Sequence, residues 1–392
     1  MTTNLWSTNS PEHFWRLLID LPAEQWRIAV ESASSVLKLT LPNLEIQSLL
    51  VEVLGEGQFG PDHWQISAPQ KIYYAFKPFL PRSMTRFMRR VYGAPSHKLN
   101  WPIEDRYARF QWEVGRQILL LSGRKSLPFI SFWPEGYKFS FVITHDIETA
   151  GGQANLRRVA ELEESLGFRS SFNVIPEKYP VDSPLLQDLK KRGFEIGIHG
   201  LKHDGKLYSS KARFDSRATR INYYLNEFGA VGFRSPLTHR QPYWMQALEI
   251  QYDLSFFDTD PFEPIPGGTM SIWPFELGRF IELPYTLVQD YTLINVLREK
   301  SPATWLRKID FLEKYTGMAL VNVHPDYLLN QENWDIYVEF LHKMKQRGGY
   351  WHAIPREVAA WWRARMYTPS ISTLEKAIPK EFHLEEGGIV IS

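Results

Sequence analysis

Residues 139–148 read FSFVITHDIE, and this stretch decides the fold because an apolar run ends abruptly in polar residues. The run has the composition of a strand that is buried on both faces, and a helical stretch follows it. The same succession of apolar run and helical stretch recurs along the chain. The apolar runs are Phe139–Ile143, Ser171–Ile175, Glu195–Ile198, Val231–Phe233, Leu254–Phe257, Phe280–Leu283 and Met318–Val323. The helical stretches are Asn155–Leu166, Ser183–Arg192, Phe214–Phe228, Pro302–Tyr315 and Asn333–Arg347.

This alternation of strands and helices is typical of a parallel sheet with helices outside it. About seven such units favour a closed α/β barrel over an open doubly wound sheet. A last strand within 349–355 leads into a helix at Pro355, since proline is favoured in the first turn of a helix. No G-x-G-x-x-G motif follows the first strand, which argues against dinucleotide binding. The sequence therefore predicts an α/β barrel domain over residues 138–368.

The segments outside the barrel have a less regular pattern. We predict an N-terminal α+β extension over residues 1–100, a connecting segment over 101–137 and a loose C-terminal tail over 369–392. The strand-like pieces of these segments are Trp26–Val30, Val36–Leu41, Gln47–Val53 and Ile389–Ile391. The role of the extension is open among a cap over the barrel, an interface and a membrane contact.

Residues 82–91 have a helical pattern with several arginines along it. Met84, Phe87, Met88 and Val91 fall on one apolar face of this helix. A basic amphipathic helix can lie on an anionic membrane surface. Surface helices more commonly pack on their own domain with the charged side chains in solvent. Peripheral membrane contact through 82–91 and packing on the protein itself are both open from the sequence.

The charge balance and the lack of cysteine exclude several classes of protein. The 392 residues include 45 Lys and Arg against 44 Asp and Glu, so the formal net charge of +1 gives no overall case for nucleic-acid binding. Without cysteine, disulfides, thiolate zinc sites and cysteine nucleophiles are excluded, and any metal needs His, Asp or Glu. The start lacks a signal-peptide pattern, and no run of about 18 apolar residues occurs, so we expect a cytoplasmic protein.

Polar clusters follow five of the predicted strands, where a parallel barrel keeps its active site. The clusters are Thr144–Glu148, Ile198–Asp204, Gly232–Pro236, Phe257–Pro261 and Val321–Tyr327. Each alone has an ordinary structural explanation, such as a helix cap, a surface salt bridge, a turn or a hydrogen-bonded histidine. Their occurrence at successive strand ends favours an active site. Histidines four residues apart, together with carboxylates, suit zinc and similar divalent ions.

Taken together, these motifs resemble those of the polysaccharide deacetylases, the NodB-homology or carbohydrate esterase family four group. The resemblance covers residues 138–366 and is greatest for variants from surface-glycan biosynthesis that carry His-Asp-x-Asp in place of Thr-Phe-Asp-Asp. It implies a distorted (β/α)7 barrel. It also implies a hydrolase that depends on a divalent metal, with zinc first and cobalt, nickel or manganese as alternatives.

The resemblance also implies a role for each matching residue. Asp146 matches the general base, His324 the general acid and Arg234 the arginine that holds the base. Glu148, His199 and His203 match the metal ligands. Matches on the oxyanion and substrate side of the site are Pro236, Leu237 with its backbone N–H, Asn322, and either Asp258 or Asp260.

Three positions depart from the family pattern. Glu148 replaces the usual Asp, which could alter metal affinity or metal preference. Thr238 stands where glycine is common, and Asn322 stands where an apolar residue commonly meets the acetyl methyl group, so that a smaller acyl group such as formyl is conceivable. His145 has no assigned role beyond hydrogen bonding behind the site.

The function that the resemblance implies is removal of an N-acyl group, with acetyl first, from an amino sugar during polysaccharide or glycolipid synthesis. A lipid-linked or nucleotide-linked sugar, reached at the inner face of the membrane, is the substrate we expect. Three alternatives stay open: a deformylase or other hydrolase of non-peptide C–N bonds, a glycan-binding protein with a degraded site, and a scaffold protein. The oligomeric state is not predicted.

Overall fold

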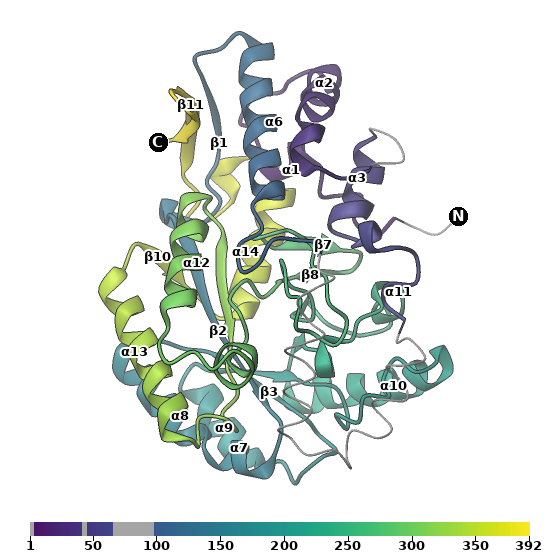
Figure 1. Cartoon of the computed structure of the whole chain (residues 1–392), viewed down its shortest axis with the longest axis vertical. Coiled ribbons are helices and arrows are strands. Elements are labelled where there is room, and N and C mark those ends of the chain that lie inside the picture. The colour runs from purple at the N-terminus through teal and green to yellow at the C-terminus, as the bar shows by residue number, and fades with distance from the viewer. Residues whose placement is uncertain (1–3, 41–44, 66–97) are drawn as a thin grey trace.

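The barrel is formed by seven parallel strands in a computed structural model that describes residues 4–40, 45–65 and 98–392 (Figure 1). They belong to a nine-stranded sheet that also contains β10 (Tyr350–His352) and the antiparallel β7 (Phe275–Leu277). In order around the sheet, the barrel strands are β2 (Phe139–Ile147), β3 (Ser171–Val174), β4 (Glu195–Ile198), β5 (Gly232–Phe233), β6 (Tyr252–Asp253), β8 (Phe280–Glu282) and β9 (Met318–Asn322). On one side of β9 the barrel closes, because β9 pairs with β2, the first strand. On the other side of β9, the N–H groups of Thr286 and Leu287 donate to the Leu320 carbonyl at 3.2 and 3.0 Å. The predicted distorted (β/α)7 barrel is confirmed.

Strand β2 is the centre of the sheet, and all nine of its residues are buried. One edge of β2 pairs with β9 from Ser140 to Thr144. The other edge pairs with β10 (Tyr350–His352) near its start and with β3 near its end. A strand with neighbours on both edges and side chains packed on both faces needs a continuous apolar run, as FSFVI provides.

Helices cover the outside of the barrel. They are α7 (Ala150–Ala154), α8 (Leu156–Leu166), α9 (Ser183–Lys191), α10 (Lys211–Phe228), α11 (Pro242–Met245), α12 (Ala303–Lys314), α13 (Gln331–Arg347) and α14 (Pro355–Tyr367). Side-chain N-caps begin two of these helices. Asp182 accepts from the Leu185 N–H at 3.0 Å ahead of α9, and the Ser210 hydroxyl accepts from the Arg213 N–H ahead of α10. Within the described ranges, no helix has both the length and the apolar character that crossing a bilayer requires.

The predicted strands and helices of the barrel agree with the structure to within a few residues, with one shift. The fifth strand is Tyr252–Asp253, two residues before the predicted Leu254–Phe257. The prediction did not include Asp253, because a carboxylate is unusual in a buried strand of a barrel. Its side chain is satisfied there by the backbone N–H and the hydroxyl of Ser255, at 3.0 and 2.8 Å.

The strands predicted at 26–30, 36–41 and 47–53 are wrong. Residues 26–30 and 47–53 lie in the helices α2 (Ala23–Ala33) and α3 (Ile46–Val53). Residues 36–37 lie in the short 3-10 turn η1 (Ser34–Leu37), 38–40 form no strand, and residue 41 is outside the described residues. In α2 the buried residues are Trp26, Ala29, Val30 and Ala33, which is the spacing of one helical face. The predicted helix at 82–91 lies outside the described residues.

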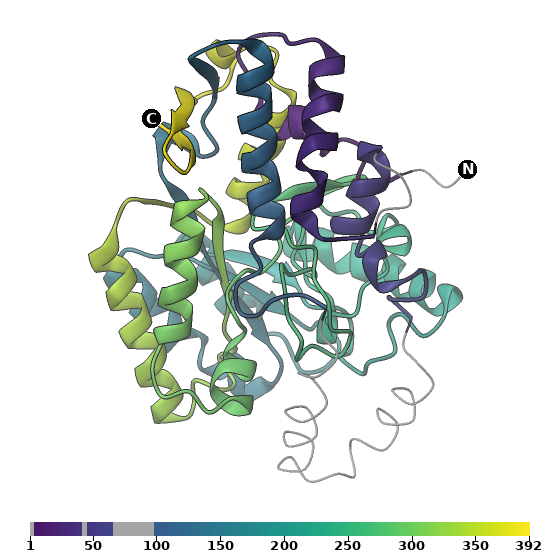
Figure 2. The ribbon, with the colours of Figure 1, turned by 45° about the horizontal axis from the view of Figure 1, so that its top comes forward.

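Segments from both ends of the chain pack together above the barrel (Figure 2). Helix α6 (Arg106–Ser122) lies beside α2, and β1 (Ser126–Ile130) pairs with β11 (Pro379–Glu385), which pairs with β12 (Gly388–Ile391). The tail thus forms two strands where one was predicted. Trp15 of α1 (Pro11–Trp15), in the N-terminal extension, is fully buried among aromatic rings of the connecting segment and the C-terminal tail. These rings are Trp112, Phe129, Phe132 and Phe382. The domain boundaries at 100, 137 and 368 stay predictions.

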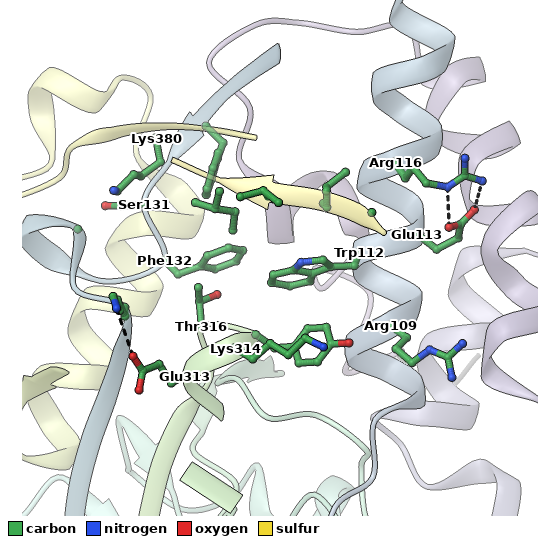
Figure 3. Close-up of a pocket in the computed structure, with 18 of the residues that line it drawn as sticks. Arg109, Trp112, Glu113, Arg116, Ser131, Phe132, Glu313, Lys314, Thr316 and Lys380 are labelled. Atoms are coloured by element: carbon green, nitrogen blue, oxygen red, sulfur yellow. Dashed lines mark hydrogen bonds and ion pairs between the residues drawn. The ribbon is translucent and has the colours of Figure 1, made fainter. Parts of the chain in front are cut away.

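Two cavities lie at opposite ends of β2. The larger, of about 640 Å³, adjoins Lys138 before the strand, and the smaller, of about 550 Å³, adjoins Asp146 near its end. Figure 3 shows Trp112 and Phe132 side by side in the larger cavity, which Arg116 and its partner Glu113 on α6 also line. Among the residues that the structure describes, the one cluster of three metal-ligating side chains lies at the smaller cavity. The smaller cavity is therefore the candidate site.

Candidate active site

Glu148, His199 and His203 meet at the carboxyl ends of β2 and β4, as the sequence predicted for a metal site. One ligand atom from each residue lies within 4.8 Å of the other two. Glu148 Oε1 lies 3.1 Å from His203 Nε2. His199 Nδ1 lies 3.0 Å from the carbonyl oxygen of Arg234, which can only accept, so Nδ1 carries the proton and Nε2 is free to bind a metal. Two imidazole nitrogens and a carboxylate oxygen fit a zinc-like divalent ion.

The loop after β4 brings the two histidines to one side. Gly200 and His203 both have left-handed backbones, with φ of 65° and 52°, and the two imidazole centroids lie 5.1 Å apart. A Cβ atom at Gly200 would lie 2.3 Å from Cγ of Pro236, so the close approach of these loops requires glycine. Burial lowers the pKa of His199 to about 4, which keeps it neutral as a metal ligand must be.

The Asp146 carboxylate is buried beside the three ligands and is held by neutral and charged donors. Oδ1 accepts from Asn173 at 3.0 Å, and Oδ2 accepts from Asn322 at 3.0 Å. Arg234 Nη1 lies 3.5 Å from Oδ1. Burial alone would raise the pKa of Asp146, but His199, which is charged only at low pH, and the permanently charged Arg234 outweigh it and hold this pKa well below its usual range. The carboxylate is therefore ionised across the ordinary pH range.

Arg234 is buried after β5 and has its own fixed contacts. Its Nε donates to the Leu254 carbonyl at 2.9 Å, and its Nη1 donates to the Thr144 hydroxyl at 3.0 Å. The guanidinium is thereby fixed to neighbouring strands of the barrel. A permanent cation in this place provides a lasting counter-charge for Asp146.

His324 lies across from the metal triad, with Nε2 at 4.0 Å from Asp146 Oδ2. Asp290 accepts from both its Nδ1, at 2.7 Å, and its backbone N–H, at 2.8 Å. Burial would lower the pKa of His324, but the Asp290 carboxylate opposes this effect and raises the pKa to about 10. The site thus pairs an ionised carboxylate with a protonated imidazole, the two states that a general base and a general acid need.

The turn after β5 lines the cavity with Leu237 and Thr238. Both residues have left-handed backbones, with φ of 60° and 50°. The Thr238 hydroxyl donates to Glu263 Oε2 at 2.6 Å, so this turn holds a further carboxylate of the cavity wall. The hydroxyl of Thr238 therefore holds this carboxylate in place.

Four residues of the predicted oxyanion and substrate set lie elsewhere. Asp258 is buried in an ion pair with Lys308 at 2.7 Å, and Asp260 accepts from the Tyr285 hydroxyl at 3.0 Å, so neither carboxylate lines the cavity. Pro236 packs against Gly200.

Asn322 is likewise absent from the cavity lining, and its side chain contacts Asp146. It donates to Asp146 and accepts from the Thr144 hydroxyl at 3.2 Å. Its amide therefore holds the Asp146 carboxylate and is not among the side chains that line the cavity.

Three site residues were missed from the sequence. Asn173 interrupts the apolar run SFNVI, and a polar residue inside a buried strand could have been detected. Asp290 caps the helical turn Tyr291–Val296, which was not predicted, and Asp326 belongs to the cluster Val321–Tyr327 but was given no role. Asp326 accepts from the Glu148 N–H at 2.9 Å and so holds the backbone of a metal ligand.

His145 points away from the cavity into a buried polar network. Its Nδ1 lies 2.8 Å from the Val323 carbonyl, and its Nε2 lies 2.6 Å from Glu163. Glu163 also accepts from Ser170 and Tyr337, each at 2.6 Å. The network ties β2 to the residue before His324, in accord with the hydrogen-bonding role suggested for His145.

Comparisons with known proteins give structural matches only. No family model matches the sequence, and no relative was found among curated proteins. A solved structure described as a "putative polysaccharide deacetylase" from Mycobacterium smegmatis is 18% identical with a TM-score of 0.50, covering 61% of this chain and 94% of that chain.

Two further structures are similar at lower TM-scores. A "probable polysaccharide deacetylase" from Pseudomonas aeruginosa PAO1 is 14% identical, with a TM-score of 0.48, covering 60% of this chain and 95% of that chain. The Puue allantoinase is 13% identical, with a TM-score of 0.47, covering 60% of this chain and 94% of that chain.

Proposed function

Since this chain has the fold of the polysaccharide deacetylases, we propose that it is a metal-dependent hydrolase that removes an N-acyl group, with acetyl first, from an amino sugar. One observation carries the proposal. The metal-ligand triad lies beside a buried carboxylate and a charged imidazole, with His199 Nε2 at 3.8 Å and His324 Nε2 at 4.0 Å from Asp146 Oδ2. This arrangement is suited to hydrolysis of an amide.

Glu148, His199 and His203 are the residues that would hold the metal. A divalent ion bound by these three would polarise the acyl carbonyl and lower the pKa of water. Zinc fits two nitrogens and one oxygen best, and cobalt, nickel and manganese accept the same ligand types. Glu148 has a longer side chain than the aspartate expected at this position, and Asp326 fixes its backbone by accepting from the Glu148 N–H.

Asp146 is the residue we assign as general base. Its carboxylate is ionised and is held on both oxygens, which orients it before the substrate binds. It accepts a proton from the attacking water, whose oxygen forms the new bond to the acyl carbon. The charge that develops on the acyl oxygen falls on the side of Leu237, whose backbone N–H we assign to the oxyanion.

His324 is the residue we assign as general acid. Its high pKa keeps Nε2 protonated at neutral pH, and Asp290 holds the ring in position. As the C–N bond breaks, Nε2 gives its proton to the leaving nitrogen. The products are a free amino sugar and a carboxylate, and the proton taken by Asp146 balances the one given by His324.

Acid release from acylated amino sugars tests this proposal. Purified protein loaded with zinc is incubated with N-acetylglucosamine oligosaccharides, with a nucleotide-linked N-acetyl sugar and with the N-formyl analogues, and acetate and formate are measured. We expect acetate from at least one substrate and none after chelation. Lipid-linked sugars form a further arm. A zinc-loaded protein that releases no acid in any arm contradicts the proposal.

A further inference from the structure

A buried carboxylate of the N-terminal extension, Glu56, is bound to the barrel beside the candidate site. Its side chain is fully buried, and it lies just after α3 with a left-handed backbone. Oε2 accepts from Arg240 Nε at 2.6 Å and from Trp64 at 3.1 Å. Oε1 accepts from Arg240 Nη2 and from the Gly268 N–H at 2.9 Å. His63 lies 3.3 Å away on the same oxygen.

Arg240 connects this carboxylate to two loops of the barrel. Its Nη1 donates to the carbonyl oxygens of Thr238 and Ile265, at 3.1 and 3.4 Å. The guanidinium lies over the Phe257 ring, 4.5 Å from its centroid. A buried guanidinium needs a full set of acceptors and a counter-charge, and Glu56 is that counter-charge.

The two loops that Glu56 and Arg240 hold form part of the cavity wall. Leu237 and Thr238 come from the first loop, and Glu263 and Pro264 come from the second. The Thr238 hydroxyl joins the loops through Glu263, which also accepts from Gln289 at 3.2 Å. The extension therefore reaches the substrate side of the site through three successive contacts.

Backbone strain shows where this support is needed. Leu237 and the β-branched Thr238 both lie in the left-handed region, which such residues rarely adopt. Strain of this kind persists only where the surrounding contacts enforce it. In the second loop, a Cβ atom at Gly267 would lie 2.9 Å from Glu56 Oε1, and one at Gly268 would lie 2.1 Å from the Asp258 carbonyl, so glycines permit the close approach.

We infer that Glu56 is a positioning residue of the site: through Arg240 and Gly268 it holds the turn with Leu237 and the loop with Glu263 in the conformation that receives the substrate. The N-terminal extension is then part of the catalytic unit. The assignment to a reaction rests on the proposed deacylase function, whereas the control of loop conformation does not.

Two variants and one matched control test the inference. Glu56→Gln removes the charge and keeps the shape, and Arg240→Lys keeps the charge and removes the fork of donors. Glu104→Gln is the control, because Glu104 is also a fully buried carboxylate, in the connecting segment that follows the extension. Its contacts are to Arg106 at 2.7 Å and to the Asn100 N–H.

Two measurements are made on each full-length variant. Amide hydrogen exchange by mass spectrometry over residues 234–241 and 260–270 should become faster in Glu56→Gln and Arg240→Lys and not in the control. In zinc-loaded protein, kcat should fall about tenfold to a hundredfold with little change in KM. Zinc stoichiometry should stay that of the wild type, because the ligands are untouched.

The outcomes separate positioning from general stability and from the proposed function. Unchanged exchange in both loops of a folded Glu56→Gln protein overturns the inference. Failure of both variants to fold also overturns it, because the pair is then a determinant of folding. If the wild-type protein has no deacylase activity but the variants still exchange faster in the two loops, the control of loop conformation is upheld and only the proposed function is removed.

Discussion

Nδ1 of His324 lies 2.7 Å from Oδ1 of Asp290, and the other carboxylate oxygen accepts from the His324 backbone N–H at 2.8 Å. One side chain thus fixes both the ring and the backbone of the proposed acid. Nε2 is left facing the cavity on the side of Asp146. The charge state of the site depends on this pair as much as on the metal ligands.

Asp290→Asn should move the alkaline limb of the pH–activity profile to lower pH. In the wild type, the acid is lost as pH rises through the pKa of His324, which is about 10. Without this carboxylate, burial is opposed only by the charges of Glu148 and Asp146, so this pKa falls towards the ordinary value of histidine. Activity near neutral pH should then fall, and kcat should recover as the pH is lowered.

The measurement is kcat against pH for both proteins with zinc bound. Asp326→Asn is a useful comparison, because it alters a nearby carboxylate that does not contact the His324 ring in any hydrogen bond of the described residues. An alkaline limb that stays at the same pH in Asp290→Asn would show that another group limits activity there.

His199→Ala and His203→Ala should each lower zinc affinity by a factor of about ten to a hundred or more, because each removes one of three ligands. Isothermal titration calorimetry on chelated protein measures this directly. The exposed His342 gives the matched control, since His342→Ala should leave affinity unchanged. Equal zinc affinity in all three variants would exclude this triad as the metal site.

Asp146→Asn should lower kcat by about a hundredfold to ten thousandfold, the usual contribution of a general base. The amide keeps the shape of the side chain but cannot accept the proton from water. Zinc should still bind, because Asp146 is not a ligand of the triad. Steady-state kinetics and a zinc assay on the same preparation check both points, and activity within a few-fold of the wild type would remove Asp146 from the mechanism.

Asp258→Ala should destabilise the protein without altering the site. This outcome would distinguish a structural role of Asp258 from the substrate contact that the resemblance implied. Lys308 would be left buried without its counter-charge, at a cost of about 3–5 kcal/mol in the free energy of unfolding. Adding Lys308→Met should restore much of this loss. Urea denaturation measures it, and a changed KM in the folded double variant would return Asp258 to the substrate site.

Glu163→Ala should lower the free energy of unfolding by about 3–5 kcal/mol, because His145, Ser170 and Tyr337 would lose a buried charged acceptor. The exposed Glu161 on the same helix is the control, and Glu161→Ala should change stability by less than about 0.5 kcal/mol. Similar denaturation midpoints for the two variants would contradict a supporting role for this network.

The sequence alone was enough to predict the barrel and the approximate positions of its strands along the chain. Apolar runs such as 139–143 and 318–323 indicate strands that are buried on both faces, and such a run is visible in consecutive residues of the sequence. The polar residues that follow these runs must meet at one end of a parallel barrel. Asp146, His199 and His324 could therefore be proposed as neighbours before their positions were known.

The supporting contacts were decided only by the tertiary structure. Asp290 binds His324 from 34 positions away, and Glu56 binds Arg240 from 184 positions away. Such pairs leave no local pattern, because each partner satisfies the other across space. Asp258 and Asp260 show the converse, since a suggestive place in the sequence did not bring their side chains to the cavity. Local periodicity determines which residues form strands and helices, whereas the packing of distant segments determines which polar groups share a charge or a proton.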